Sequence, residues 1–173
     1  FRSFNCNKVI GRLIATKFMN MGQTCIAPDY VVVHDDDYDI FLNQLIDTIN
    51  TTYGKSFNDQ LNSKSLGRIV NHEHMNRLID LLQKSKSKIL YGGEFSSEDL
   101  FMAPTIIDAS SKEKEPLEEE IFGPIIPLLK YSSEQELEQI ISNINTPLAL
   151  YVFSSNKKFI SKIKNSTSSG GLC

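Results

Sequence analysis

Apolar residues recur at three- and four-residue spacing in several stretches of the chain, which is the pattern of helices with one buried face. In the longest stretch, 36–53, Phe41, Leu45 and Ile49 fall on one side of a helix. Shorter stretches of the same kind predict further helices, at 9–19, 75–82, 137–144 and 159–163. Ser133 and Glu136 have the spacing of a capping box at the start of one of them.

Short runs rich in β-branched residues alternate with these helices. They predict strands at 29–34, 88–91, 101–107, 125–129 and 148–153, with loops at 96–99 and 165–171. The run 29–34 is apolar on both faces, as in a strand of a covered parallel sheet. Because parallel strands need crossover connections, the alternation predicts an α/β fold, with a mostly parallel sheet and helices on both faces. One domain is expected over 1–173.

Composition and charge narrow the classes of function. Of the 173 residues, 40% are hydrophobic and 23% are charged, as in a folded globular domain. The net charge of −3, without a cluster of basic residues among aromatic ones, argues against a nucleic-acid partner. The longest uncharged apolar run, 121–129, is short for a membrane span and contains glycine and proline.

The cysteines and the first residues bear on the origin of the chain. The three cysteines, at positions 6, 25 and 173, form neither a disulfide framework nor a metal-binding pair. We therefore expect a reducing, cytoplasmic location. The chain starts at Phe1, with neither an initiator methionine nor an apolar leader, so we expect it to be cut from a longer protein. The sequence leaves open whether that parent has a membrane anchor.

Several patterns that could carry chemistry have simpler explanations. Neither GxGxxG nor GxxxxGK[ST] occurs, so the chain has no recognisable phosphate-binding loop. His72 and His74 are two residues apart and do not share a helix face, which predicts a solvated helix start rather than a zinc site. The carboxylates of residues 35–37 and 118–120 suit the first turns of helices, the second after Pro116. We predict no metal site.

Cys25 is the strongest candidate for chemistry. Free cysteine is among the most buried residue types, which favours an inert core thiol. Its position, between the glycine side of a turn and a strand, favours a thiol that faces a crevice near backbone N–H groups. A cysteine hydrolase would need a histidine base, and no histidine has an evident orienting partner. The residues alone leave the first two interpretations open.

The segment 18–27 closely resembles the active-site cysteine segment of aldehyde dehydrogenases, and 27–31 resembles its variant in the class 3, fatty-aldehyde type. The segment 119–124, Glu-Glu-Ile-Phe-Gly-Pro, is similar to the second signature of that family. Further resemblances follow the family's order, at 67–69, 103–106, 148–154 and 168–171. Together they cover essentially the whole chain.

The resemblance implies a fold, a reaction and roles for residues. The thiolate of Cys25 attacks an aldehyde, a hydride passes to NAD or NADP, and water hydrolyses the thioester to a carboxylic acid. Asn20, Gly22 and Gln23 shape the loop, and the N–H of Cys25 supplies half of the oxyanion hole. Glu120 binds the nicotinamide ribose, and Phe122 packs near the ring. Medium- or long-chain aliphatic or aromatic aldehydes are the expected substrates.

Parts of the family pattern are missing from these 173 residues. The resemblance implies that the cofactor-binding domain, the water-activating glutamate, the second oxyanion donor and the oligomerisation hairpin lie outside the chain. We expect the fragment to be inactive alone and the full-length enzyme to be a homodimer. The alternative hypothesis is a non-catalytic interaction or ligand-binding module that keeps the fold.

Overall fold

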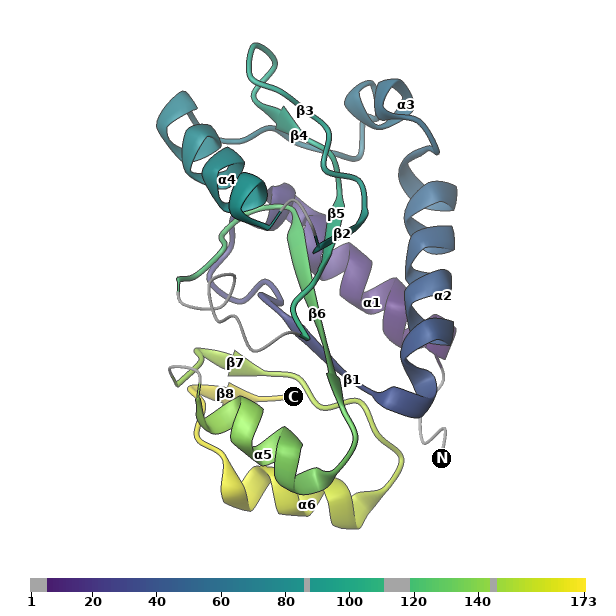
Figure 1. Ribbon diagram of the computed structural model, residues 1–173, viewed down its shortest axis with the longest axis vertical. Helices are drawn as coiled ribbons and strands as arrows, with labels where there is room; N and C mark the ends of the chain where they lie inside the picture. The colour runs from purple at the N-terminus through teal and green to yellow at the C-terminus, as the bar shows by residue number, and fades with distance from the viewer. Residues whose placement is uncertain (1–5, 86–87, 111–118, 144–145) are drawn as a thin grey trace.

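The computed structural model describes residues 6–85, 88–110, 119–143 and 146–173 (Figure 1). The first half holds α1 (Cys6–Phe18), the 3-10 helix η1 (Met19–Gly22), β1 (Val31–His34), α2 (Asp35–Tyr53), α3 (Phe57–Leu61) and α4 (His72–Lys84). The second half holds β2 (Ile89–Tyr91), β3 (Phe95–Ser96), β4 (Phe101–Met102), β5 (Thr105–Asp108), β6 (Ile125–Tyr131), α5 (Glu134–Ser142), β7 (Ala149–Leu150), α6 (Lys157–Ser166) and β8 (Gly171–Leu172).

A four-stranded sheet in the order β1-β6-β5-β2 forms the centre of the molecule. β6 pairs in parallel with β1 and with β5, and β2 joins the other edge in antiparallel orientation. In Figure 1, α1 and α2 lie on one side of β6 and α4 lies on the other. The α/β fold with a mostly parallel sheet is therefore confirmed.

The core forms where the apolar faces of the helices meet the sheet. Ile10, Ile14 and Phe18 of α1 are buried, as are the residues that the periodicity of α2 predicted. The first five residues of β6 are buried as well, as expected of a central parallel strand. The other buried apolar residues of the strands and α4 include Val33, Ile106, Ile107, Met75, Leu78 and Leu82. This core fixes the ends of α1 and β6, where the candidate site lies.

Several predicted strands have different extents. β1 begins only at Val31, and Asp29 lies in the preceding loop, where its carboxylate accepts from the N–H of Ile121. The predicted strand 101–107 is two strands, because the N–H of Ala103 turns to the carbonyl of Glu94 and Pro104 has no N–H to donate. The strand predicted at 148–153 is reduced to β7, since its partner β8 is equally short.

The predicted loops are also partly wrong. Ser96 belongs to β3, which pairs with β4 in a short hairpin, whereas the rest of 96–99 is its turn. In the segment 165–171, α6 continues to Ser166 and Gly171 already belongs to β8. In each case backbone hydrogen bonds extend an element into a stretch whose polar and glycine residues indicate a loop.

Three differences between the sequence analysis and the structure concern helices. α3 was missed because five residues are too few for a periodic pattern, although Ser56 and Asp59 form a capping box there. Glu119 and Glu120 are not helical, and Glu118 and Pro116 lie outside the described residues. At α5, the hydroxyl of Ser133 accepts from the N–H of Glu136 as predicted, but the Glu136 carboxylate accepts from Ser132 instead of Ser133.

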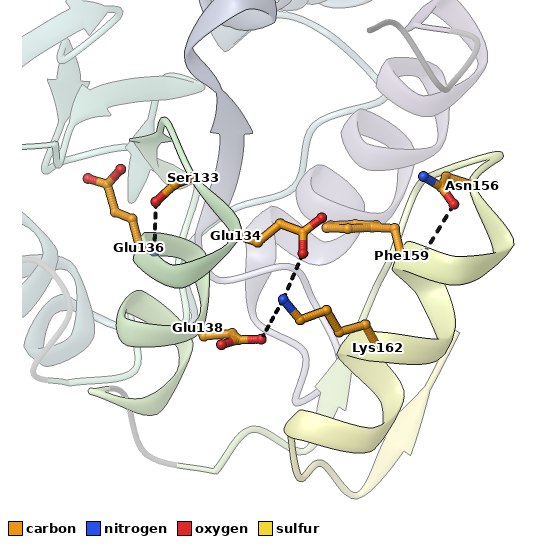
Figure 2. A network of polar contacts seen from close by, with 7 residues as sticks. All are labelled: Ser133, Glu134, Glu136, Glu138, Asn156, Phe159 and Lys162. Carbon is orange, nitrogen blue, oxygen red and sulfur yellow. Dashed lines mark hydrogen bonds and ion pairs between the residues drawn. The ribbon is translucent and has the colours of Figure 1, made fainter.

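The C-terminal helices α5 and α6 are joined by an exposed network (Figure 2). Lys162 of α6 lies between two carboxylates of α5, 2.7 Å from Glu134 and 3.2 Å from Glu138. Asn156 caps α6 by accepting from two of its first N–H groups. In Figure 1 these helices lie beside β7 and β8. Among the described residues, no helix has the length and apolar character that a bilayer span requires.

Candidate active site

The loop between α1 and β1 begins with three residues of left-handed backbone. Asn20, Met21 and Gly22 have φ values of 51°, 57° and 75°. Asparagine and glycine tolerate this region best, since asparagine can bond to nearby backbone and glycine lacks a Cβ. The N–H of Gln23 donates to the carbonyl of Asn20, and the side-chain amide of Asn20 donates back to the carbonyl of Gln23, each at 3.1 Å. The chain therefore reverses sharply just before Cys25.

The buried amide of Gln23 ties this loop to the segment before α4. Its Nε2 donates to the carbonyls of Asn20 and Arg68, at 2.9 and 3.0 Å, and its Oε1 accepts from the N–H of Val70 at 2.9 Å. All of these bonds join a side chain to backbone separated by up to 47 residues. Gln23 thus fixes the loop without contributing a reactive group.

Cys25 lies at the second position of a tight turn. The N–H of Ala27 donates to the carbonyl of Thr24 at 3.0 Å, which closes the turn around Cys25 and Ile26. The Cys25 side chain is exposed, so the interpretation as a buried core thiol is wrong. The hydroxyl of Thr24 is buried and has no hydrogen-bond partner among the described residues. The thiol of Cys25 is therefore exposed to solvent, on a turn whose backbone is held by a hydrogen bond.

The Cys25 loop and the segment 119–124, which both stand out in the sequence, are in contact at Gly22 and Gly123. A Cβ built on Gly22 would lie 2.3 Å from the carbonyl oxygen of Gly123, closer than real contacts allow. A Cβ on Gly123 would collide with the side chain of Leu78 from α4. The two backbones can approach because Gly22 has no side chain, and Gly123 packs against Leu78 because it has none either. This contact places the Cys25 loop against the segment 119–124.

Lys17, which is buried, and Asp29, which is half-buried, interact electrostatically near the same contact. The carboxylate of Asp29 accepts from the N–H of Ile121 at 3.1 Å. Lys17 of α1 is 1% exposed, and burial lowers its pKa to about 8, although the charges of Asp29 and Glu120 partly offset this effect. Burial raises the pKa of Asp29, and the positive charge of Lys17, the bond from Ile121 and the charge of Arg77 oppose the rise. Lys17 and Asp29 thus join the two segments electrostatically.

Two side chains of α4 hold the backbone of the segment 119–122. Arg77 donates from Nη1 to the carbonyl of Glu120 at 3.2 Å and from Nη2 to the carbonyl of Ile121. His74 bonds through Nε2 to the carbonyl of Phe122 at 2.7 Å, while its Nδ1 accepts from Arg77. This arrangement requires the neutral tautomer with the proton on Nε2. Phe122 itself has left-handed backbone, with φ of 47°.

These contacts show which site residues the fold brings together. Asn20, Gly22, Gln23 and Cys25 form one loop, and Glu120 and Phe122 lie on the segment that contacts it. Sequence reasoning missed four supporting residues, which are Lys17, Asp29, His74 and Arg77. The prediction of a solvated helix start is wrong for His74, which is half-buried against Phe122. A lone lysine on the apolar side of α1 was the available signal for Lys17.

Glu120 offers an exposed carboxylate beside the Cys25 loop. The side chain of Glu120 is exposed, whereas its backbone is held by Arg77, so its carboxylate can accept hydrogen bonds from a ribose diol. The ring of Phe122 is half-buried edge-on against His74. Within the described ranges, no group of three or more metal-binding side chains is present.

Comparison with known proteins gives one consistent result. The model of the aldehyde dehydrogenase family matches residues 1–173. The 4,4'-diaponeurosporen-aldehyde dehydrogenase of Staphylococcus aureus is 37% identical over 160 residues, which are 92% of this chain and 34% of that protein. Aldehyde dehydrogenase family 3 member A2 of Rattus norvegicus is 37% identical over 93% of this chain and 32% of its own length.

Further relatives and structures agree. The dimeric NADP-preferring aldehyde dehydrogenase of Bos taurus is 38% identical over 93% of this chain and 65% of its own length. A solved structure of Staphylococcus aureus AldH in a substrate-bound state superposes with a TM-score of 0.93 at 34% identity, over all of this chain and 37% of that one. The chain thus spans about a third of the length of most of these relatives. It belongs to the aldehyde dehydrogenase family.

Proposed function

We propose that this chain provides the nucleophilic thiol of an NAD(P)-dependent aldehyde dehydrogenase. The observation that carries the proposal is the exposed Cys25 on a defined turn, held by the Gly22–Gly123 contact against the segment of Glu120 and Phe122. Because the relatives are longer, the activity belongs to the whole enzyme. Residues 1–173 act in it as the thiol-bearing domain, and further catalytic groups come from sequence outside the matched third.

The proposed reaction begins at Cys25. Its thiolate forms a bond to the aldehyde carbon, and the carbonyl π electrons move to oxygen, which the backbone N–H of Cys25 stabilises. As the oxygen electrons re-form the C=O bond, the carbon loses its hydrogen with the bonding pair, which leaves a thioester on Cys25. Water then cleaves the C–S bond, so the acid departs and the thiol returns. NAD or NADP, when bound, supplies the acceptor for the hydride.

The residues of the second segment have binding roles in this proposal. The exposed carboxylate of Glu120 accepts from the nicotinamide ribose, and Phe122 packs near the nicotinamide ring. Arg77 supports Glu120 through its carbonyl, and His74 supports Phe122 through its carbonyl and by ring contact. The substrates proposed are medium- or long-chain aliphatic or aromatic aldehydes. A homodimer is proposed for the full-length enzyme, in keeping with the bovine relative, which is named dimeric.

A graft tests the function directly. Residues 1–173 replace the matching third of the Staphylococcus aureus relative, and aldehyde-dependent NAD(P)H formation is followed by absorbance. We expect turnover by the graft and its loss in Cys25→Ala. Cys173→Ala is the matched control, because Cys173 is also an exposed thiol. If Cys25→Ala turns over like the unaltered graft, the thiol is not the nucleophile. If the unaltered graft is inert with a range of aldehydes, the interaction-module hypothesis takes the place of the proposed function.

A further inference from the structure

The turn that carries Cys25 is held from a distant part of the chain. The hydroxyl of Tyr151 donates to the carbonyl of Ile26 at 2.8 Å, across a separation of 125 residues. Ile26 directly follows Cys25, so this bond reaches the residue next to the exposed thiol. Nothing in the local sequence around Cys25 predicts such a partner.

The bond acts on one particular peptide group. The carbonyl of Ile26 and the N–H of Ala27 belong to the same planar unit. The carbonyl accepts from Tyr151, and the N–H donates to the carbonyl of Thr24 at 3.0 Å. Both polar atoms of this peptide are therefore anchored, one within the turn and one from outside it. The Ile26–Ala27 peptide plane therefore cannot rotate without losing a hydrogen bond. Because Cys25 precedes this peptide in the same turn, its backbone is held as well.

Tyr151 can serve as an anchor because its own backbone is fixed on both sides. The N–H of Cys173 donates to the carbonyl of Leu150 at 2.9 Å, and the N–H of Val152 donates to the carbonyl of Cys173 at 2.8 Å. These bonds continue the parallel pairing of β7 with β8, which places Tyr151 opposite Cys173. The tyrosine thus stands on a paired strand, and its hydroxyl reaches out to the turn.

We propose that Tyr151 is a positioning residue for the nucleophile, which orients the Cys25 turn through the Ile26 carbonyl. It touches neither the thiol nor the substrate. The inference rests on the proposed function, in which the backbone N–H of Cys25 stabilises the oxyanion. Losing the tether lets that N–H swing away from the oxygen, which slows the chemical step and leaves aldehyde binding unchanged.

The first test measures the tether without any turnover. In the 173-residue chain, Tyr151→Phe removes the hydroxyl alone, and amide hydrogen exchange at Ala27 is followed by NMR. We expect exchange about three- to tenfold faster, the range that one hydrogen bond supports. Tyr131→Phe is the control, since its ring packs on His34 at the far end of β6. Unchanged exchange at Ala27 in Tyr151→Phe overturns the proposal.

The second test asks whether the tether matters for chemistry. In the graft, Tyr151→Phe is expected to lower kcat about three- to tenfold at unchanged KM for the aldehyde, with the melting temperature kept. A merely structural tyrosine would lower the melting temperature and leave kcat unchanged, which contradicts a positioning role. If the unaltered graft is inert, the proposed function fails by itself, and the exchange at Ala27 still decides whether Tyr151 holds the turn.

Discussion

At the scale of single residues, the contact between Gly22 and Gly123 makes the sharpest prediction about stability. Gly22→Ala places a Cβ 2.3 Å from a backbone oxygen, at a φ of 75°. We expect it to lower the free energy of unfolding by roughly 2–4 kcal/mol, because left-handed strain and overpacking add. Urea denaturation measures the change.

Gly11→Ala is the matched control for this substitution. Gly11 lies within α1, and a Cβ there meets no atom within 4 Å. Alanine is the better helix former, so we expect a gain of about 0.5–1 kcal/mol. Equal effects of the two substitutions would show that the backbones of Gly22 and Gly123 are not in close contact.

The lowered pKa of Lys17 predicts how the free energy of unfolding depends on pH. Burial lowers its pKa from 10.5 to about 8, so between these values the unfolded chain binds more protons than the folded one. Stability should therefore rise with pH, by about 1–2 kcal/mol from pH 8 to about 9.5, relative to Lys17→Met. Burial also raises the pKa of Tyr30 and Tyr53, which opposes this trend above about pH 10 in both proteins alike, so the comparison with Lys17→Met removes it. Urea melts across this range check it, and parallel pH profiles for the two proteins would contradict it.

At the scale of elements, α4 holds the segment of Glu120 through backbone contacts. Arg77→Lys keeps the charge but loses the fork that reaches two carbonyls at once. In the graft we expect the Kd for NAD(P)+ to rise roughly tenfold, the loss of one charge-assisted hydrogen bond. Fluorescence titration of the cofactor measures the change.

Arg68→Lys serves as the control for Arg77, because the Arg68 guanidinium also donates to two backbone carbonyls, those of Leu61 and Gly67. Neither carbonyl belongs to the segment of Glu120. Its cofactor affinity should match that of the unaltered graft. Comparable losses in both variants would mean that the effect on cofactor affinity is not specific to the segment that Arg77 holds.

The pairing of α5 with α6 should depend on apolar burial and little on the network of Figure 2. Leu137 is buried, so Leu137→Ala should cost about 2–4 kcal/mol of unfolding free energy. Lys162→Met removes only exposed ion pairs, and its small effect should vanish in high salt. Thermal melts compare the two variants. A larger shift for Lys162→Met would give the network the main role.

Some of these elements follow from local sequence and others do not. The periodicity of α2 and the run of β6 are long enough that burial repeats visibly, and both elements are present as expected. α3 and β7 are too short for any period. The contacts of Asp29 with Ile121 and of His74 with Phe122 join residues 92 and 48 positions apart. Such pairings depend on the folded topology, so local patterns could not reveal them.

At the scale of the whole molecule, distinctive segments meet beside the end of α1, within the part of the chain that the structure describes. The loop after α1, the segment before β6 and the tyrosine after β7 come together there, although they lie far apart in sequence. The motifs of the first two were visible in the sequence. The roles of Cys25, Glu120 and Phe122 stay predictions, because the contacts define the shape of the site and not its reaction.

The most direct test of Cys25 as the nucleophile follows the chemical state of its thiol in one turnover. The graft is mixed with aldehyde and NAD(P)+, quenched in acid and digested, and the peptide that carries Cys25 is weighed by mass spectrometry while NAD(P)H is measured in parallel. We predict an acyl adduct on Cys25, none on Cys173, and no NAD(P)H from Cys25→Ala. Formation of NAD(P)H at an unchanged rate by Cys25→Ala would contradict this prediction.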